Sequence, residues 1–494
     1  MKQPIETKME NWWTRASGGR EVALLALPLI LSTASWAVMH FVDRMFLLWH
    51  DPQDTAATLS SGTLLWTIMA LPLGIASYVN TFVSQYYGAG RKHRIGLVLF
   101  QGLAFGWATV PIFIAISPFS TAVFRFMGHD PGMVRLEATY LQVNCWGAGA
   151  AVISAAYSSF FTGRGEMRVV MIIDIAASVV DAVLNYILIF GKFGFPEMGI
   201  AGAALSTVLA QWLKIVVYWW LLRAPELRQT YGLDSGRHID RDLVWRLQRF
   251  GGANGLQMQL EGLAFTILVI YIARLGTQAT AATTLALSIN IVAFVPMIGI
   301  GVAVSTLLGQ HLGANNPRLA ARAVWSGLWL ALSYNLVFAV LYLVVPHVFL
   351  MAHQAGMNSS EFEEIRRLTI VLLRFVAAYC LFDAMQLTFC SAIKGAGDTR
   401  YVLLTTVVTS LIAIALTEWG MSQKGWGLLW CWTVLMLWVF SLAIAYTGRF
   451  LQGRWKHMRV IEPEQRNVRD TNGINDNDEN ASLEGKESHA ASTL

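Results

Sequence analysis

The chain consists largely of apolar runs of about twenty residues or more, the length that an α-helix needs to cross a bilayer. Only 14% of its residues are charged, whereas soluble proteins average about 25%. Inside a bilayer no water can bond to the backbone, so each spanning run has to form a helix. We therefore predict an all-α polytopic membrane protein with twelve membrane-spanning helices. The predicted spans are 22–48, 57–82, 96–117, 138–162, 169–191, 199–222, 250–274, 281–307, 323–350, 368–393, 402–421 and 425–449.

Two short motifs each occur twice, at loops in equivalent positions. The motif Gln85-Tyr-Tyr-Gly-Ala-Gly90 follows the second span and matches Gln310-His-Leu-Gly-Ala-Asn315 after the eighth. Likewise, Gly163-Arg-Gly-Glu-Met-Arg168 follows the fourth span and matches Gly395-Ala-Gly-Asp-Thr-Arg400 after the tenth. Each half has six spans and enters the membrane from the same side, so the repeat is parallel, about an axis along the membrane normal. We expect two six-helix bundles with a substrate cleft between them.

The longest interior polar segment, 223–249, separates the two halves. The loops on its side of the membrane are richer in Lys and Arg than those on the other side, so the positive-inside rule places both termini in the cytoplasm. We expect a multi-pass protein of the plasma (inner) membrane. The predicted parts are an N-terminal segment 1–21, an N-lobe 22–222, a linker 223–249, a C-lobe 250–450 and a disordered tail 451–494, which is poor in apolar residues towards its end.

Several classes of function lack support in the sequence. The net charge of +5 is spread over loops, so we expect no nucleic-acid partner. The four cysteines lie in apolar segments without metal-ligand spacing and indicate neither a disulfide framework nor a tightly bound metal. No Walker A loop and no Ser/His or Cys/His arrangement stands out. We expect a monomer that is not an enzyme, uses no cofactor, and interacts with membrane lipid.

Acidic residues inside the spans of the second half indicate a functional site. Asp383 lies in the middle of the tenth span, where a carboxylate costs several kcal/mol unless it is protonated, paired or bound to a cation. Tyr379 lies four residues earlier, on the same helix face. Glu261 in the seventh span has no basic residue within a turn. These three are candidate cation ligands, with Na⁺ at Glu261 and Asp383. The alternative is a structural role in bonding neighbouring helices.

The first half contains a second polar set. Asp181 and Asn185 share a face of the fifth span, and Asp43 lies in the first. If these spans pack together, the three could bind a small cation through oxygen ligands, or a single proton shared by two like charges. The alternatives are a structural hydrogen-bond network and an ion pair of Asp43 with its neighbour Arg44. Lys214 in the sixth span is expected to reach the cytoplasmic surface.

Three amides, Asn144, Gln257 and Asn290, either line the cleft as substrate-binding residues or bridge helices, which is the commoner use of such side chains.

Together these features resemble the multidrug and toxic compound extrusion (MATE) family, in particular its NorM-like branch. The motifs that carry the resemblance are Phe41-Val-Asp43, Gln85–Gly90, the run from Asn185 to Ala204, Glu261, and Tyr379-Cys-Leu-Phe-Asp383. The resemblance implies two lobes and alternating access driven by inward Na⁺ or H⁺ flow. It also implies that Glu261, Tyr379 and Asp383 form a C-lobe cation site, and that Asp43, Asp181 and Asn185 form an N-lobe polar site.

Two positions depart from the NorM-like pattern. Position 181 is Asp where Asn is frequent, and Arg44 stands where a small polar residue is common. The coupling ion therefore stays open between Na⁺ and H⁺, with Na⁺ favoured because the C-lobe set matches without substitution.

The expected function is that of a secondary active antiporter that exports organic, cationic or amphipathic compounds. One alternative is a lipid-linked sugar flippase of the same superfamily, but such proteins tend to carry cationic cleft residues, whereas the deep residues here are mostly acidic. An intramembrane enzyme and a receptor without transport are alternatives from other classes.

Overall fold

The computed structural model describes residues 12–351, 359–424 and 426–462, and within these ranges the regular elements are helices. Eleven helical segments of this described part are long and apolar enough to cross a membrane. The remaining predicted span is α6 (Pro131–Gly163), which has 33 residues but is less apolar because many of its residues are small or polar. It packs between α2, α4 and α8. The prediction of twelve spanning helices in two bundles is thereby confirmed.

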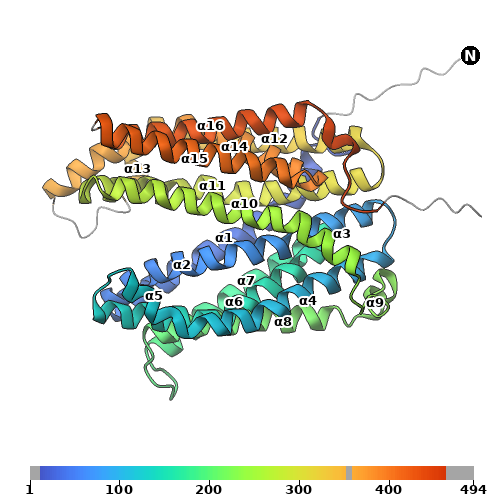
Figure 1. Cartoon of the computed structure of the whole chain (residues 1–494), viewed down its shortest axis with the longest axis horizontal. Coiled ribbons are helices and arrows are strands. Elements are labelled where there is room, and N and C mark those ends of the chain that lie inside the picture. Colours follow the sequence, from blue (N-terminus) through green and yellow to red (C-terminus); the bar gives the residue numbers. More distant parts are fainter. Residues whose placement is uncertain (1–11, 352–358, 425, 463–494) are drawn as a thin grey trace, which may run out of the picture. The chain divides into compact units, whose positions relative to one another are not determined.

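The first half extends from α1 to α8, followed by a short helix in the connecting segment (Figure 1). The second predicted span is split at Tyr78 into two helices, and the third continues into a one-turn 3₁₀ helix (Ser117–Phe119) and α5. The helices are α1 (Gly19–His50), α2 (Pro52–Ser77), α3 (Val79–Gly88), α4 (His93–Ile116), α5 (Ser120–Phe126), α6, α7 (Met167–Ile189), α8 (Ile200–Leu221) and α9 (Pro225–Tyr231).

The second half follows the same order. Its helices are α10 (Arg241–Ala273), α11 (Thr277–Gly313), α12 (Pro317–Val344), α13 (Pro346–Met351), α14 (Ser359–Ala396), α15 (Thr399–Lys424) and α16 (Leu428–Leu451). The first of these begins inside the predicted linker, because the Asp240 side chain accepts the backbone N–H groups of Asp242 and Leu243 and so caps the helix.

The predicted tail begins later than residue 451. The segment from Gly453 to Val460 is folded: it contains a 3₁₀ helix (Arg454–His457), and Trp455 and Val460 are buried. Trp455 stacks on Phe450 at the end of α16. This aromatic contact holds the segment against the second bundle. The predicted tail residues 463–494 lie outside the described residues.

The two repeated motifs adopt the same backbone turn in each half. Gly90 and Asn315, which are equivalent in the first motif, have φ angles of +72° and +54°. Gly165 and Gly397, equivalent in the second motif, have φ angles of +88° and +107°. Left-handed residues of this kind commonly end helices, and Asn is one of the few non-glycine residues that adopt them readily. The repeat seen in the sequence is therefore a repeat of structure.

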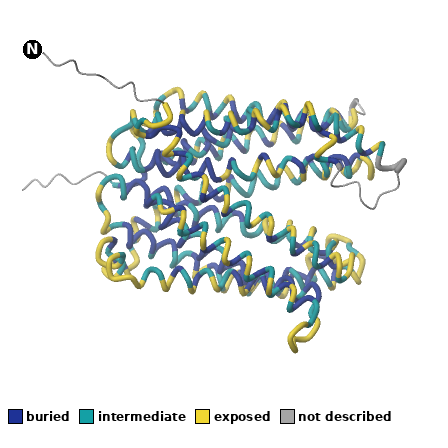
Figure 2. Tube along the Cα trace, turned by 180° about the vertical axis from the view of Figure 1, so that it is seen from behind, coloured by how far each residue is buried: buried dark blue, intermediate teal, exposed yellow. Residues whose placement is uncertain are grey.

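Each bundle has its own buried core, and exposed and partly exposed residues recur along the helices around it (Figure 2). In the second half α14 packs on α11, α12 and α16. All four cysteines are buried and free, as expected from their apolar surroundings. On α12, Leu336, Val337, Val340 and Leu343 are each 49–57% exposed, which suits a lipid-facing surface.

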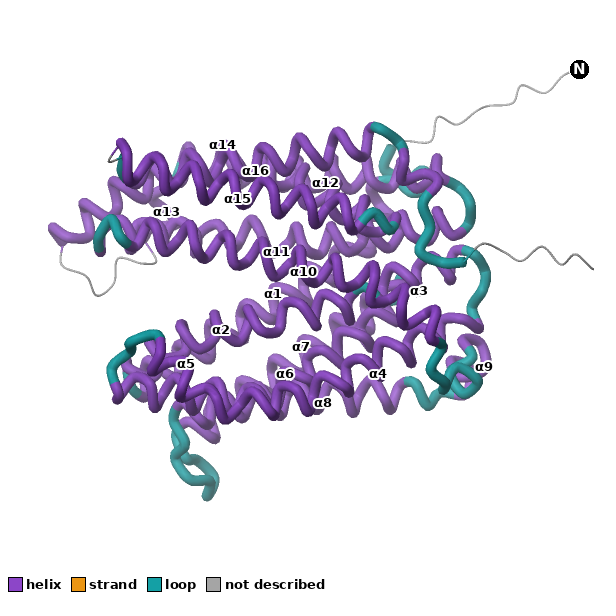
Figure 3. Tube along the Cα trace, in the orientation of Figure 1, coloured by secondary structure: helices purple, strands orange, loops and turns teal. Residues whose placement is uncertain are grey.

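The repeated turns lie at one end of the bundles, together with α9, the start of α1 and the end of α16 (Figure 3). The first turns of α1 also reach across to the second half, since Val22 and Ala26 belong to the core built around α11 and α12. The two halves are therefore joined most closely at the end that carries the basic loops.

Candidate functional site

The polar set predicted for the first half is brought together by three helices. Asn185 on α7 donates through its side-chain nitrogen to Oδ1 of Asp43 on α1, at 2.5 Å, and to Oδ2 of Asp181, at 2.9 Å. All three side chains are buried. Ser206 on α8 donates to the carbonyl oxygen of Asn185 at 2.7 Å and so fixes which end of the amide faces the acids. One amide group thus holds two carboxylates.

One oxygen of this set is left over. Among the described residues, Oδ1 of Asp181 is buried and accepts no hydrogen bond. A buried acceptor without a donor is costly unless a proton or a cation is bound to it. This oxygen is therefore the acceptor of the N-half set that has no donor among the described residues.

Asp43 is bonded to Asn185 and forms no ion pair with Arg44 in the described part of the chain. The basic side chain that contacts it is His40, whose Nδ1 lies 3.8 Å from Oδ2 of Asp43. Because α1 continues to His50, Asp43 lies about two turns from the end of its helix. It is thus closer to the end opposite the basic loops than to the middle of the span.

The acid of the second half, Glu261, is held between two amides. Gln257, one turn earlier on α10, donates to Oε2, and Gln386 on α14 donates to Oε1 at 3.1 Å. Both carboxylate oxygens therefore accept N–H groups, and the second bond ties α10 to α14. Hydrogen bonds of this kind stabilise the ionised form of a carboxylate.

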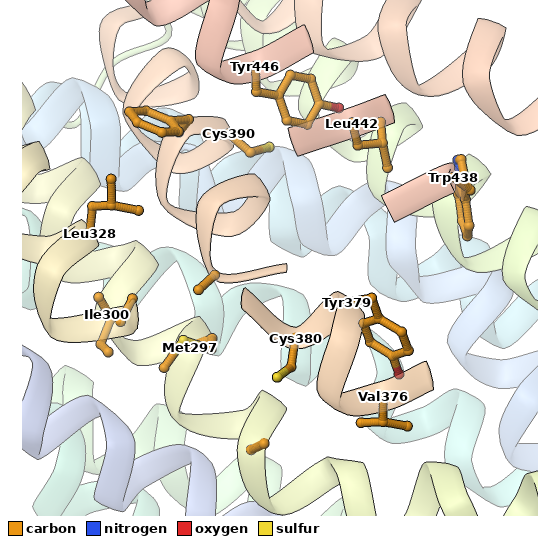
Figure 4. Close-up of a cluster of buried hydrophobic side chains, with 14 of the residues drawn as sticks. Met297, Ile300, Leu328, Val376, Tyr379, Cys380, Cys390, Trp438, Leu442 and Tyr446 are labelled. Atoms are coloured by element: carbon orange, nitrogen blue, oxygen red, sulfur yellow. The ribbon is translucent and has the colours of Figure 1, made fainter. Parts of the chain in front are cut away.

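Asp383 lies one turn before Gln386 on α14 and interacts electrostatically with Glu261. Within the described residues it shares no hydrogen bond with Glu261. Tyr379 is buried among Val376, Cys380 and their neighbours (Figure 4), and its hydroxyl accepts the Asn290 amide of α11 at 3.2 Å. The three predicted C-lobe residues thus share one region. Glu261 bonds to Gln257 and Gln386, Tyr379 bonds to Asn290, and Asp383 interacts with Glu261 electrostatically.

The three amides that were candidates for substrate binding have different environments. Gln257 and Asn290 are bonded to Glu261 and Tyr379 and belong to the acidic set of the second half. Asn144 is buried and donates to the carbonyl of Tyr140 on its own helix, at 2.9 Å. The two additional site residues, Ser206 and Gln386, were not predicted. Gln386 lies three residues beyond Asp383 on the same helix face, a spacing that could have indicated it.

The expectation for Lys214 is wrong. Its Nζ lies 2.6 Å from Oδ1 of Asp174, and Ser32 of α1 donates to the other oxygen of that carboxylate. Both charged side chains are only about one-fifth exposed, so the lysine pairs inside the first bundle and does not extend to the surface. The partner of an intramembrane lysine on a neighbouring helix is not encoded in local spacing.

In the described ranges no three His, Cys, Asp or Glu side chains are grouped so that they could hold a metal ion. Each polar set instead offers two carboxylates accompanied by amide and hydroxyl groups. Such oxygen-rich sets suit a proton or a weakly held hard cation and provide none of the soft ligands that transition metals prefer.

The chain matches the MatE family model over residues 28–187 and 255–419, which together make up more than half of its length. It is 27% identical over 443 residues to the probable multidrug resistance protein NorM of Xanthomonas campestris pv. campestris, covering 88% of this chain and 94% of that protein. It is 26% identical over 464 residues to the multidrug resistance protein PmpM of Pseudomonas aeruginosa, covering 90% of this chain and 94% of the other.

Solved structures agree in fold. The outward-facing conformation of a multidrug resistance MATE family transporter of the MOP superfamily matches with a TM-score of 0.78 and 19% identity, covering 91% of this chain and 99% of that one. The eukaryotic MATE transporter AtDTX14 matches with a TM-score of 0.78 and 17% identity, covering 88% and 96%. The two matched segments of the family model fall one in each half of the repeat.

Proposed function

The chain belongs to the MatE family, and from this premise we propose that it is a secondary active antiporter that exports organic cations or amphipathic compounds in exchange for Na⁺ or H⁺. The relatives named as multidrug resistance proteins support drug extrusion as the general activity. Alternating access of a cleft between the two bundles would carry the substrate across, with inward ion flow as the energy source.

The observation that carries this proposal is an acidic set inside each bundle, which is buried in the first half and partly buried in the second. An intramembrane carboxylate is retained at a cost of several kcal/mol, which is reasonable where its charge changes during a cycle. In the described part of the chain, the direct hydrogen bonds to Asp43, Asp181 and Glu261 come from neutral amides, whereas Lys394 interacts with Glu261, and Arg44 with Asp43, only electrostatically. A carboxylate that is not hydrogen-bonded to Lys or Arg can take up and release an external cation.

We assign the two sets different ions. Both oxygens of Glu261 accept N–H groups, and an ionised Glu261 beside Asp383 would bind Na⁺. Asp43 and Asp181 share a single amide donor, and two like charges so close together favour one shared proton. Because a carboxylate must be ionised to bind Na⁺, Na⁺-driven transport should weaken as the pH falls.

The acids also favour one substrate class over another. A lipid-linked sugar carries an anionic pyrophosphate, which two acidic sets would repel. A cationic or neutral amphipathic compound would not be repelled, so multidrug extrusion is favoured over the flippase alternative.

The test is efflux of a fluorescent organic cation from proteoliposomes under an imposed Na⁺ gradient at constant pH, compared with a proton gradient without Na⁺. We expect the Na⁺ gradient to drive efflux and Glu261→Gln to remove this response. Glu226→Gln, at an exposed glutamate of α9, is the matched control and should behave as wild type. If only a proton gradient works, and Asp43→Asn is inactive while Glu261→Gln is harmless, coupling resides in the N-half set. If neither gradient drives efflux, the antiporter proposal fails.

A further inference from the structure

The two copies of the first repeated motif meet each other at the end of the bundles that carries the basic turns. A Cβ atom added at Gly88 would overlap the carbonyl oxygen of Gln310, and one added at Gly313 would overlap the carbonyl oxygen of Gln85. Gly88 and Gly313 are equivalent in the repeat, as are Gln85 and Gln310. The motif of each bundle therefore packs on that of the other in the same way, as a two-fold relation requires.

The glutamine side chains complete a reciprocal exchange between the bundles. Nε2 of Gln85 donates to the carbonyl of Gly395 at 2.9 Å, and Nε2 of Gln310 donates to the carbonyl of Gly163 at 3.0 Å. These two glycines are equivalent residues of the second repeated motif. Each lies at the end of a long helix, where backbone carbonyls lack partners within the helix. Each glutamine thus satisfies a helix end in the opposite bundle.

From this geometry we propose that Gln85 and Gln310 are the gating residues of the transport cycle: together they hold the end of the protein with the basic turns closed, and both bonds must break for that end to open. The proposal deepens the proposed function and rests on it. When this end opens, each glutamine exchanges its bond to the carbonyl for a bond to water, so the free-energy difference between the closed and the open state is small. A gate that opens and closes in every cycle needs closed and open states of similar free energy.

The two sides of the gate differ in their surroundings. Gln85 is fully buried, and its side-chain oxygen also accepts the backbone N–H of Val460 at 2.8 Å, so the folded segment after α16 holds it in place. Gln310 is only partly buried. Asn80 of α3 also donates to Thr306 of α11 across the same interface, at 3.2 Å. Water therefore reaches the Gln310 bond more easily, and opening should begin there.

The test measures the distance between the two bundles directly. Spin labels are placed on cysteines at the exposed positions Lys92 and Arg318, in a background from which the four native cysteines have been removed, and distances are recorded by pulsed electron resonance in nanodiscs. We expect Gln310→Ala to raise the ratio of the longer to the shorter distance by about fivefold, and Gln85→Ala/Gln310→Ala to raise it further. Gly313→Ala, which wedges the interface, should act in the same direction.

Gln101→Ala is the matched control, because Gln101 is also a buried glutamine that donates to a backbone carbonyl, that of His238, but its bond does not join the two bundles. It should leave the distance distribution unchanged. Unaltered distributions in Gln310→Ala, in the double variant and in Gly313→Ala would overturn the gate. If the variants alter the distance distributions but the wild-type protein transports no substrate in the efflux assay, the gate is supported and the proposed function is overturned.

Discussion

The single amide nitrogen of Asn185 donates hydrogen bonds to two carboxylates, those of Asp43 and Asp181. Its orientation depends on Ser206, whose hydroxyl donates to the amide oxygen. Without that bond the amide could turn and present its oxygen to the acids, which would repel them. Ser206 is therefore a positioning residue that acts on the N-half set through Asn185.

Ser206→Ala should slow proton-driven efflux by about two- to tenfold, the effect expected from losing one buried hydrogen bond of about 1 kcal/mol. Rescue by Ser206→Thr, which keeps the hydroxyl, would separate positioning from a packing defect. Ser333→Ala is the control, since Ser333 is exposed and its hydroxyl donates to a carbonyl of its own helix, that of Trp329. Initial rates in proteoliposomes measure the effect, and equal rates for Ser206→Ala and wild type would contradict it.

Asp383→Asn should abolish ion-coupled efflux while the protein still accumulates in the membrane. The amide keeps the size of the side chain but cannot gain or lose the charge that the cycle uses. Quantitative blotting of membranes together with efflux assays separates the two effects. Normal ion-driven efflux by this variant would show that Asp383 is not the coupling acid.

At this scale the sequence predicted the acids better than their partners. Asp43, Asp181 and Asn185 were predictable as one set, because charged residues are rare in spans and Asp181 and Asn185 lie four apart. Ser206 and Gln386 were not, since neutral polar residues in membrane helices mostly bridge helices and their partners depend on how helices pack. The ion pair of Lys214 with Asp174 was missed for the same reason.

The pairing of α2 with α10 depends on small residues at the crossing. A Cβ atom at Gly255 would overlap the backbone carbonyl of Leu71, and Gly74 faces Gly255 itself. The preceding residue, Asn254, donates to the carbonyl of Gly74 at 2.7 Å. Backbones that approach this closely have no room for side chains, so the crossing joins the two bundles by direct helix contact.

Gly255→Ala should lower the free energy of unfolding by about 1–3 kcal/mol, the usual cost of overpacking a close contact. Gly252→Ala, three residues earlier on the same helix, is the control because nothing lies near its added Cβ. Thermal unfolding in detergent compares the two variants. A melting temperature of Gly255→Ala no lower than that of Gly252→Ala would contradict this prediction, because it would mean that α2 and α10 can move apart without losing stability.

Helix existence was predictable and helix ends were not. Each apolar run predicted a span, but the helices continue beyond the apolar part, as α10 does from Arg241, because polar residues at the membrane surface remain helical once a cap is present. The folded segment up to Val460 was likewise hidden by its polar composition. Its stability comes from contacts with distant residues such as Gln85, which no local pattern reveals.

Across the whole molecule, the loops rich in Lys and Arg gather at the closed end, which the positive-inside rule assigns to the cytoplasm. We therefore expect His238→Cys, in a cysteine-free background, to resist an impermeant thiol reagent in intact cells. Lys192→Cys, exposed in the loop between α7 and α8, is the comparison and should react. The reverse pattern would show that the orientation is inverted.

The reciprocal bonds between the repeated motifs have a further consequence for assembly. The two bundles contact each other through equivalent surfaces. In this respect they resemble the two subunits of a dimer, joined here in one polypeptide. The peptide bond after Ile239, in an exposed stretch between α9 and α10, would then be dispensable. Residues 1–239 and 240–494, expressed as separate chains, should associate in the membrane and be recovered together through an affinity tag on either one. Adding Gly88→Ala and Gly313→Ala to the two fragments should sharply reduce that recovery, because the fragments would have no covalent tether to compensate for a damaged joint.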